Sequence, residues 1–284
     1  MVNFGSAFYD LKGKLQNLYD ERESAAIAHE VLNHITGLNK TQRLINKDTL
    51  FTEAQYREYE LATSNLSKGV PLQYVLGKAW FVDWEFTVNN HVLIPRPETE
   101  ELVQWVLDDH KNDSEINILD IGTGSGCIPI SLKLKLPQAN VSSCDISEGA
   151  LVVAKSNADL LGAIVEFTEL DFLNEAARNN LPVYDVIVSN PPYIPKSEAE
   201  QMHTNVKDHE PNIALFVPDE DALVFYRAIA WFGLEHLSNK GYIYCELALS
   251  KALECKQLFI DSGYKDVELR QDMHGNWRML KAGK

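Results

Sequence analysis

Four consecutive residues, Asn190, Pro191, Pro192 and Tyr193, could hold a flat group that carries an NH2. They follow Val186 to Val188, a β-branched run that is typical of a strand buried on both faces of a parallel sheet. Adjacent prolines lack the N–H groups that a strand ladder uses, so the chain must leave the sheet there. The Asn190 amide, the carbonyl groups held by the prolines and the Tyr193 ring can accept hydrogen bonds from an NH2 group and cover its plane. A plain turn is the alternative for an Asn-Pro pair alone.

A glycine-rich segment follows an earlier predicted strand over 116–121 and precedes a predicted helix from Cys127 to Leu136. Glycines permit positive φ, so a ligand can lie against the strand end and the amino end of the helix. The pattern alone is weak, because several kinds of nucleotide-binding fold carry one. Asp120 before the loop suits a cationic amino-acid group and opposes a pyrophosphate, which disfavours a dinucleotide. The candidate cofactor-binding residues here are Asp120, Gly122, Thr123, Gly124, Ser125 and Gly126.

Acidic residues after the next two predicted strands extend this candidate site. Asp145 ends the strand over 140–144, roughly twenty residues after the glycine loop, which is the spacing of a ribose-binding acid. Helix capping by Asp145 or Ser147 is the alternative. Asp171 and Phe172 follow a third strand over 165–168. The Asp171 carboxylate is expected to bind the edge of an adenine and the Phe172 ring to cover its face, unless Phe172 is a core residue.

The elements that must position these residues alternate between strand and helix from Ile116 onward, which predicts an α/β fold with a mostly parallel sheet. The last apolar piece, Trp277 to Leu280, is expected to pair antiparallel at one edge of that sheet. Residues 2–69 show helical periodicity, with Glu53 to Leu66 as one expected helix. We therefore expect a helical domain over 1–75, a β-hairpin linker over 76–95 and an α/β domain over 96–284.

Three connecting segments have open interpretations. The aromatic residues of the hairpin from Trp80 to Val88 could seal a domain interface or form a wall over the reaction site. The rigid Pro95-Arg96-Pro97 segment could close over a cofactor or act as an elbow. Residues 195–218 are polar and lack periodicity, which favours a lid or a partner contact, and their histidines are expected to be solvated.

The composition restricts the function classes. The chain has 284 residues, a formal net charge of −15 and four scattered cysteines without a CxxC pair or zinc spacing. A reduced, cytoplasmic protein without a metal site is expected. Neither a secretory signal nor a membrane span is predicted. The sequence has no basic stripe for a nucleic-acid backbone, which disfavours DNA or RNA as substrate, whereas a basic protein surface would be attracted.

The order of these features resembles class I (Rossmann-like) methyltransferases that use S-adenosylmethionine. Four strings are similar to the HemK/PrmC family, which methylates the glutamine amide of the Gly-Gly-Gln motif in bacterial peptide chain release factors. The resemblance runs from about Pro71 to the carboxyl end, and the strings are Pro71 to Tyr74, Ile94 to Glu100, Gly122 to Cys127 and Asn190 to Ile194.

The resemblance implies S-adenosylmethionine as cofactor and release factors as protein partners, with Gly122 to Gly126, Asp145, Phe172 and Asn190 as cofactor contacts. It implies a glutamine-binding loop over Asn190 to Tyr193. Some relatives carry Trp where Phe172 stands. We expect a monomer whose helical domain binds the substrate protein, and in-line methyl transfer without a general base or an essential histidine.

The sequence is compatible with three alternatives. A glutamine in a ribosomal protein is the closest rival substrate. The exocyclic amine of adenine in DNA would suit the same loop, although the acidic composition counts against it. A non-catalytic module that retains the fold is the third alternative, and the intact Asp145 and Asn190 to Tyr193 count against that one.

Overall fold

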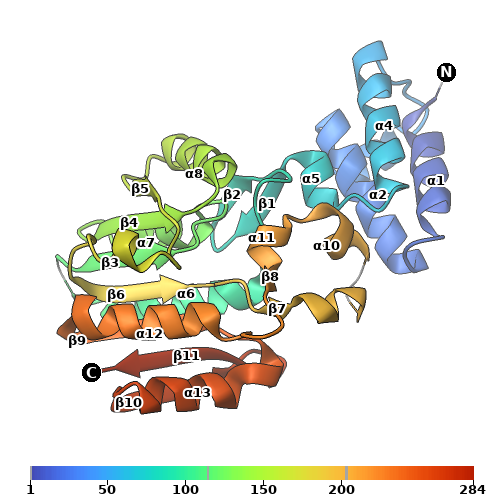
Figure 1. The fold of residues 1–284 in the computed structure, drawn as a ribbon. Coiled ribbons are helices and arrows are strands. Elements are labelled where there is room, and N and C mark those ends of the chain that lie inside the picture. Colours follow the sequence, from blue (N-terminus) through green and yellow to red (C-terminus); the bar gives the residue numbers. More distant parts are fainter. Residues whose placement is uncertain (1, 114, 202–203) are drawn as a thin grey trace. The chain divides into compact units, whose positions relative to one another are not determined.

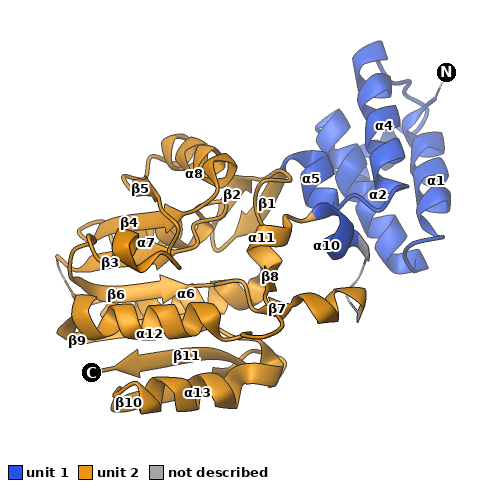
Figure 2. Cartoon of the chain, in the orientation of Figure 1, with its two compact units in different colours: residues 1–77, 203–209 blue, residues 78–202, 210–284 orange. Residues whose placement is uncertain are grey.

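The computed structural model describes residues 2–113, 115–201 and 204–284. The chain divides into two compact units (Figure 2). Unit 1 comprises Met1–Gly77 with His203–His209, and unit 2 comprises Lys78–Met202 with Glu210–Lys284. The hairpin expected as a linker therefore clusters with the larger unit, and a short internal segment clusters with the smaller one.

Unit 1 is helical. Its largest helices bury a shared apolar core formed by residues such as Leu11, Val31 and Leu66. The helix predicted over Glu53 to Leu66 is confirmed at both ends, with Thr52 as its amino-terminal cap. The helices are α1 Phe4–Leu15, α2 Glu21–Thr36, α3 Lys40–Ile45, α4 Glu53–Leu66, α5 Leu72–Leu76 and α10 Thr204–His209.

Helix α10 joins unit 1 through polar contacts. The Asn205 side-chain Nδ2 donates to the Tyr19 hydroxyl at 2.7 Å, and His209 Nε2 lies 3.3 Å from the carbonyl oxygen of Lys68. His209 thus contacts a backbone carbonyl at an exposed position, and its side chain is partly accessible to solvent. His203 lies outside the described residues.

Unit 2 is built on a seven-stranded sheet with the order β10-β11-β9-β6-β3-β4-β5 (Figure 1). The five strands from β9 to β5 in that order run parallel, and β11 pairs antiparallel with both of its neighbours. The hairpin predicted at the sheet edge is confirmed, and β10 is its outermost strand. The strands are β3 Asn117–Ile121, β4 Asn140–Asp145, β5 Glu166–Glu169, β6 Tyr184–Ser189, β9 Leu237–Glu246, β10 Asp266–Gln271 and β11 Trp277–Gly283.

Helices cover both faces of this sheet because its central strands are apolar on both sides. Val186 and Val188 of β6 face one core cluster, and Ile187 faces the other. Helices α6 Pro97–His110, α7 Cys127–Lys135 and α8 Glu148–Leu161 pack on the first face. Helices α12 Val224–His236 and α13 Ala252–Asp261 pack on the second. The predicted alternation of strands and helices is confirmed.

The β1–β2 hairpin, Lys78–Phe81 with Trp84–Thr87, packs into unit 2. Phe81 and Phe86 are fully buried in the same core cluster as α6. Neither ring lines the cavity at the strand ends, so the hairpin does not form the wall that the sequence left open.

The remaining elements of unit 2 are short. Several of them lie within residues 195–218, where the sequence shows no periodicity because elements of two to six residues are too short for a repeat. The short elements of unit 2 are α9 Glu175–Arg178, β7 Ile194–Pro195, the 3-10 helix η1 Lys196–Gln201, α11 Asn212–Leu215, β8 Phe216–Val217 and the 3-10 helix η2 Leu249–Lys251.

Candidate active site

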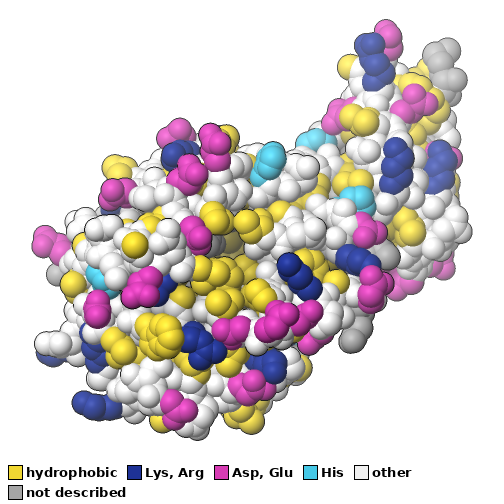
Figure 3. Space-filling model, viewed as in Figure 1, with side chains coloured by type: hydrophobic (Ala, Val, Ile, Leu, Met, Phe, Trp, Pro, Cys, Tyr) yellow, Lys and Arg dark blue, Asp and Glu magenta, His cyan; other side chains and the backbone are white. Residues whose placement is uncertain are grey.

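A cavity opens in unit 2 at the carboxyl ends of the parallel strands, where ligands bind in open α/β sheets. Figure 3 shows hydrophobic side chains gathered on this part of the surface. The predicted site residues that line the cavity are Gly122, Thr123, Gly124, Ser125, Asp145, Asn190 and Pro192. Asp120, Gly126, Asp171, Phe172, Pro191 and Tyr193 are outside this lining.

The glycine loop is held open by backbone geometry. Gly122, Gly124 and Gly126 have φ values of +85°, +53° and +81°, which residues with a Cβ rarely adopt. A Cβ on Gly126 would lie 2.8 Å from Ile130 Cδ1 of α7 and 3.1 Å from Ala154 Cβ of α8, so this glycine allows α8 to pack closely against the start of α7. A Cβ on Gly124 would meet nothing within 4 Å. The loop thus combines a tight internal turn with an open backbone face toward the cavity.

Asp145 is fixed by two backbone donors. Gly124 N donates to its Oδ2 at 2.9 Å, and Ser147 N donates to its Oδ1 at 2.8 Å. Ser147 is the amino-terminal cap of α8, which leaves Asp145 directed at the cavity. Burial raises the pKa of Asp145 above its ordinary value. Each carboxylate oxygen retains acceptor capacity for a ligand hydroxyl, as a ribose site requires.

Asp120 lies beneath the loop and is fully buried. Ser143 Oγ donates to its Oδ2 at 2.6 Å, and the Ser143 hydroxyl also contacts the hydroxyl of Thr123 in the cavity wall. Burial raises the pKa of Asp120 to about 7, and the nearby Asp145 adds to the shift. Its Oδ1 has no hydrogen-bond partner among the described residues. A cationic group bound above the loop would offset this buried charge.

Asp171 and Phe172, the predicted adenine clamp, both lie outside the lining of the cavity. The Asp171 side chain is exposed and accepts a hydrogen bond from the backbone N of Leu173 at 2.9 Å. Phe172 is 4% exposed, and its ring packs edge-on against Phe232 in the core. The core alternative for Phe172 is therefore the observed one. Exposed Ile146, which sequence reasoning missed, lines the cavity directly after Asp145 and offers an apolar surface there.

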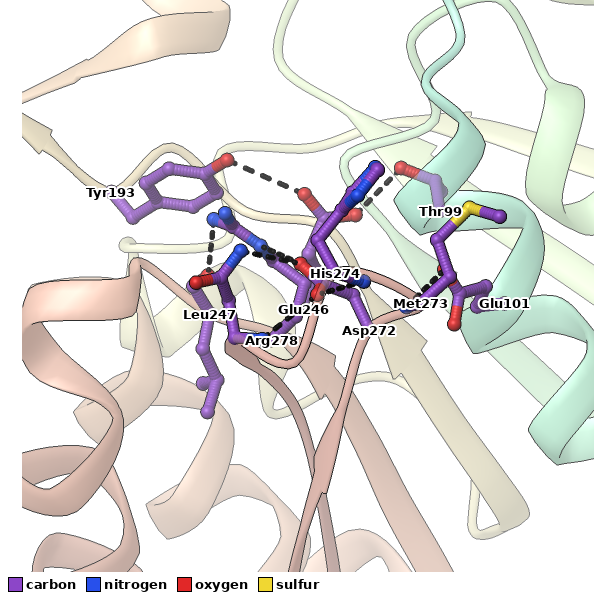
Figure 4. Close-up of polar contacts among 10 residues, drawn as sticks. Thr99, Glu101, Tyr193, Glu246, Leu247, Asp272, Met273, His274 and Arg278 are labelled. Carbon is purple, nitrogen blue, oxygen red and sulfur yellow. Dashed lines mark hydrogen bonds and ion pairs between the residues drawn. The ribbon is translucent and has the colours of Figure 1, made fainter.

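Asn190 is oriented by residues from distant parts of the chain. Its Nδ2 donates to Thr99 Oγ1 at 3.0 Å, and Thr99 Oγ1 donates to Glu246 Oε2 at 2.6 Å. Glu246 Oε1 accepts from the Tyr193 hydroxyl at 3.3 Å, as Figure 4 shows. The Tyr193 ring packs against the core cluster of α12, so it supports the Asn190 corner from behind instead of covering the cavity. Pro191 is buried.

The Pro95-Arg96-Pro97 segment belongs to the cavity. Pro95 and Arg96 line it, which favours the cofactor-closing interpretation of this segment over a simple elbow. Arg96 Nη2 contacts Glu210 Oε1 at 2.5 Å, and Ile94 N donates to Glu210 Oε2 at 3.3 Å. Burial of Glu210 was not predictable from the sequence, because a glutamate in a polar segment is usually exposed.

No group of three or more acidic, histidine or cysteine side chains that could hold a metal ion occurs among the described residues. Within the part of the chain that the structure describes, no helix is both long and apolar enough to span a membrane.

Comparisons with known proteins give matches along most of the chain. Residues 99–208 match the family model "Methyltransferase small domain", and residues 11–77 match "PrmC N-terminal domain". The chain is 38% identical over 271 residues to the "Release factor glutamine methyltransferase" of Flavobacterium psychrophilum, with 94% of each chain covered. It is 39% identical over 274 residues to the protein of the same name from Bacteroides thetaiotaomicron, with 96% of this chain and 98% of the relative covered.

A solved methyltransferase structure from Pyrococcus furiosus is similar in fold. The TM-score is 0.51 at 16% identity, with 82% of this chain and 100% of that chain covered. This likeness concerns the fold alone.

Proposed function

The chain belongs to the family of release factor glutamine methyltransferases, and from this membership we propose that S-adenosylmethionine is its methyl donor. It has the class I methyltransferase fold, and it methylates the side-chain amide nitrogen of a glutamine in peptide chain release factors. The glutamine of a Gly-Gly-Gln motif is the proposed target. S-adenosylmethionine, when bound, supplies an electrophilic methyl group on a sulfonium sulfur.

The residues around the glycine loop fit such a donor. The open backbone face at Gly124 admits a ligand, and Asp145 can accept from two ribose hydroxyls. The free Oδ1 of Asp120 fits a cationic amino-acid moiety. We retain Asp120, Gly122, Thr123, Gly124, Ser125, Gly126, Asp145 and Asn190 as proposed cofactor-binding residues.

Asn190 and the Pro191 carbonyl are proposed to bind the target amide. An amide nitrogen is a poor nucleophile because its lone pair is delocalised into the carbonyl. Acceptance of its two N–H groups by Asn190 Oδ1 and the Pro191 carbonyl would increase electron density on the nitrogen and aim it at the methyl group. Positioning of this kind can lower a barrier by roughly 7 to 11 kcal/mol. The proton leaves after attack, so no general base is required.

The observation that carries this proposal is the orientation of the Asn190 amide. Its NH2 group is used by Thr99, so its oxygen remains for the substrate at a position that lines the cavity. An acceptor at this place suits an NH2-bearing group and would repel a carboxylate.

Partner recognition is proposed to use both units. We propose that the helical domain, 1–75, grips the release factor, that 76–95 links it, and that 96–284 carries out the methyl transfer. The net charge of −15 favours a basic protein surface over a nucleic acid as partner. A cytoplasmic monomer that acts on no membrane is the proposed state.

The test is methylation of purified, unmethylated release factors by the purified chain with methyl-labelled S-adenosylmethionine. We expect one methyl group on the Gly-Gly-Gln glutamine by peptide mass spectrometry, and no label when that glutamine is replaced by alanine. Label that persists on the replaced factor, or that goes instead to a ribosomal protein or to DNA, would overturn the proposed target.

A further inference from the structure

A hydrogen-bonded chain of side chains lies directly behind Asn190. It runs from Asn190 through Thr99 to Glu246 and back to Tyr193, and we call these four residues the Glu246 relay. Figure 4 shows the contacts of Glu246 with Thr99 and Tyr193. Asn190 and Tyr193 come from the corner after β6, Thr99 from the first turn of α6, and Glu246 from the end of β9. Three separate elements therefore converge on one carboxylate.

Burial of the Glu246 carboxylate at this position is energetically unfavourable. Its side chain is 2% exposed, and a buried carboxylate costs free energy unless it is well paired. The neighbouring Arg278 directs Nη1 to the Leu247 carbonyl at 3.2 Å and Nε toward Asp272 at 3.6 Å. The Glu246 oxygens instead accept hydroxyl groups from Thr99 and Tyr193. Packing alone would be served better by an apolar side chain, which points to a functional reason for the charge.

The carboxylate determines the direction of every hydrogen bond in the relay. An ionised carboxylate only accepts, so the hydroxyl hydrogen of Thr99 must point at Glu246. Thr99 Oγ1 then presents a lone pair to Asn190, which only the NH2 half of the Asn190 amide can use. The Asn190 oxygen is thereby left for the cavity.

We propose that Glu246 is a positioning residue that acts through Thr99 to hold the Asn190 oxygen toward the substrate, and thereby makes the site select an amide over a carboxylate. The inference rests on the proposed role of Asn190 as acceptor of the target NH2 group. Thr99 is the second positioning residue, because it carries the direction of the hydrogen bond from one side chain to the other.

Replacement of Glu246 by glutamine should remove the constraint on the donor and acceptor directions of the hydrogen bonds in the Glu246 relay. A glutamine amide can donate to Thr99, whose hydroxyl hydrogen is then free to point at Asn190. The Asn190 amide could rotate in response and present its NH2 group to the cavity. Such a site would bind a carboxylate better and a target amide worse, without any change in the shape of the core.

The first experiment compares three full-length variants in methylation of intact release factor. Thr99→Val removes the hydroxyl at nearly constant volume, and we expect kcat to fall roughly 100-fold, as for other misplacements of a reacting group. Thr99→Ser keeps the hydroxyl and should restore most of that loss. Tyr226→Phe is the matched control, because its hydroxyl donates to the backbone carbonyl of Glu246 and leaves the carboxylate alone. It should keep wild-type kcat.

The second experiment measures selectivity. A release factor whose target glutamine is replaced by glutamate serves as a competitive inhibitor of wild type and of Glu246→Gln. We expect Glu246→Gln to lower kcat and to bind this carboxylate inhibitor at least several-fold more tightly relative to the glutamine substrate. Circular dichroism and the thermal midpoint exclude global unfolding, and a merely structural role for Glu246 would not alter the ratio of the two affinities.

Failure of this inference can be distinguished from failure of the proposed Asn190 role. Wild-type kcat in Thr99→Val and an unchanged affinity ratio in Glu246→Gln, with Asn190→Ala inactive, would overturn the relay and leave the role of Asn190 intact. An active Asn190→Ala would overturn both.

Discussion

The two halves of the cavity are built by different means. On one side, Asp145 and the glycine loop are fixed by backbone N–H groups and positive φ angles, all within residues 122–147. On the other side, Asn190 is fixed by the side chains of Thr99 and Glu246, which lie 91 and 56 residues away from it in the chain (190 − 99 and 246 − 190). The first half is local backbone geometry, and the second is a long-range assembly of side chains.

This difference implies two kinds of sensitivity. A site made of backbone atoms tolerates most side-chain changes except those that alter φ or the shared carboxylate. A site oriented by a chain of side-chain hydrogen bonds depends on each member and on its protonation state. We therefore expect substitutions on the glycine-loop side to act mainly on cofactor binding, and substitutions on the Asn190 side to act mainly on the chemical step.

The largest expected effect is at the corner. Asn190→Ala removes the acceptor for the target amide, and we expect kcat to fall about 10³-fold, as for the loss of one catalytic hydrogen-bonding group. Single-turnover methylation at saturating cofactor and release factor measures this step. A variant whose loss lies wholly in cofactor affinity would contradict the assignment of Asn190 to the substrate half.

The matching change on the glycine-loop side is Asp145→Asn. The amide cannot accept from two ribose hydroxyls while it also accepts from Gly124 and Ser147, so the Kd of S-adenosylhomocysteine should rise roughly 10- to 100-fold. Isothermal titration calorimetry gives the Kd. At saturating cofactor kcat should stay close to wild type, and a large fall in kcat would erase the contrast between the two halves.

The pH dependence of kcat tests whether the Asn190 side of the cavity depends on the ionisation of Glu246. Burial raises the pKa of Glu246 to about 7, Glu98 adds to the rise, and hydrogen bonds from Thr99 and Tyr193 and the charge of Arg278 oppose it. The relay needs the ionised form, so kcat should fall about 10-fold between pH 8 and pH 6 in wild type. Glu246→Gln should show a flatter profile. The same inflection in that variant would assign it to Asp120, whose pKa burial also raises to about 7.

The free energy of unfolding should fall as pH rises, whereas kcat should increase. Folding raises the pKa of Glu246 from its ordinary value of 4.5 to about 7, so between these pH values the folded state holds a proton that the unfolded chain releases. The free energy of unfolding therefore decreases as pH rises from about 4.5 to about 7 and levels off above that range. Glu246→Gln removes this contribution, and urea unfolding at several pH values would detect its loss. An identical pH slope in wild type and variant would contradict it.

A smaller effect on binding is expected at Phe172. Phe172→Leu should reduce the free energy of unfolding by about 1 to 2 kcal/mol through lost core packing, and change the Kd of S-adenosylhomocysteine less than about 2-fold. Asp171→Asn is the companion variant and should change neither quantity measurably, because its side chain is exposed. A large loss of cofactor affinity in either would restore the adenine clamp.

The smallest effect is expected at His91, the one histidine among the residues that line the cavity. If transfer needs no general base, His91→Asn should keep kcat within about 2-fold of wild type. A loss of two or more orders of magnitude in kcat, with the Kd of S-adenosylhomocysteine unchanged, would show that a histidine removes the proton.

The same contrast explains what the sequence could predict. The glycine loop, Asp145 and Asn190 follow strand ends and carry motifs within a few residues, so their place at one edge of a parallel sheet was predictable. The alternating pattern likewise predicted the fold of unit 2. Asp120 was predicted at the loop, although the structure places it beneath Thr123 and connects it to the cavity through Ser143.

Residues whose role comes from long-range packing gave no such signal. Thr99 and Glu246 are 147 residues apart, and nothing near either one in sequence marks them as partners. Phe172 follows a strand end, as a ligand-binding residue would, yet its ring packs against Phe232 because the chain turns it into the core. Glu210 is hidden in a polar segment and is recognisable only from its contacts with Arg96 and Ile94.

A crystal structure of the chain with S-adenosylhomocysteine and a Gly-Gly-Gln peptide would locate the cofactor sulfur and the target nitrogen together. We expect the thioether sulfur over the glycine loop, the peptide glutamine nitrogen facing it, and that nitrogen donating to Asn190 Oδ1 and the Pro191 carbonyl. A sulfur bound away from the loop, or an Asn190 amide whose NH2 group faces the glutamine, would contradict it.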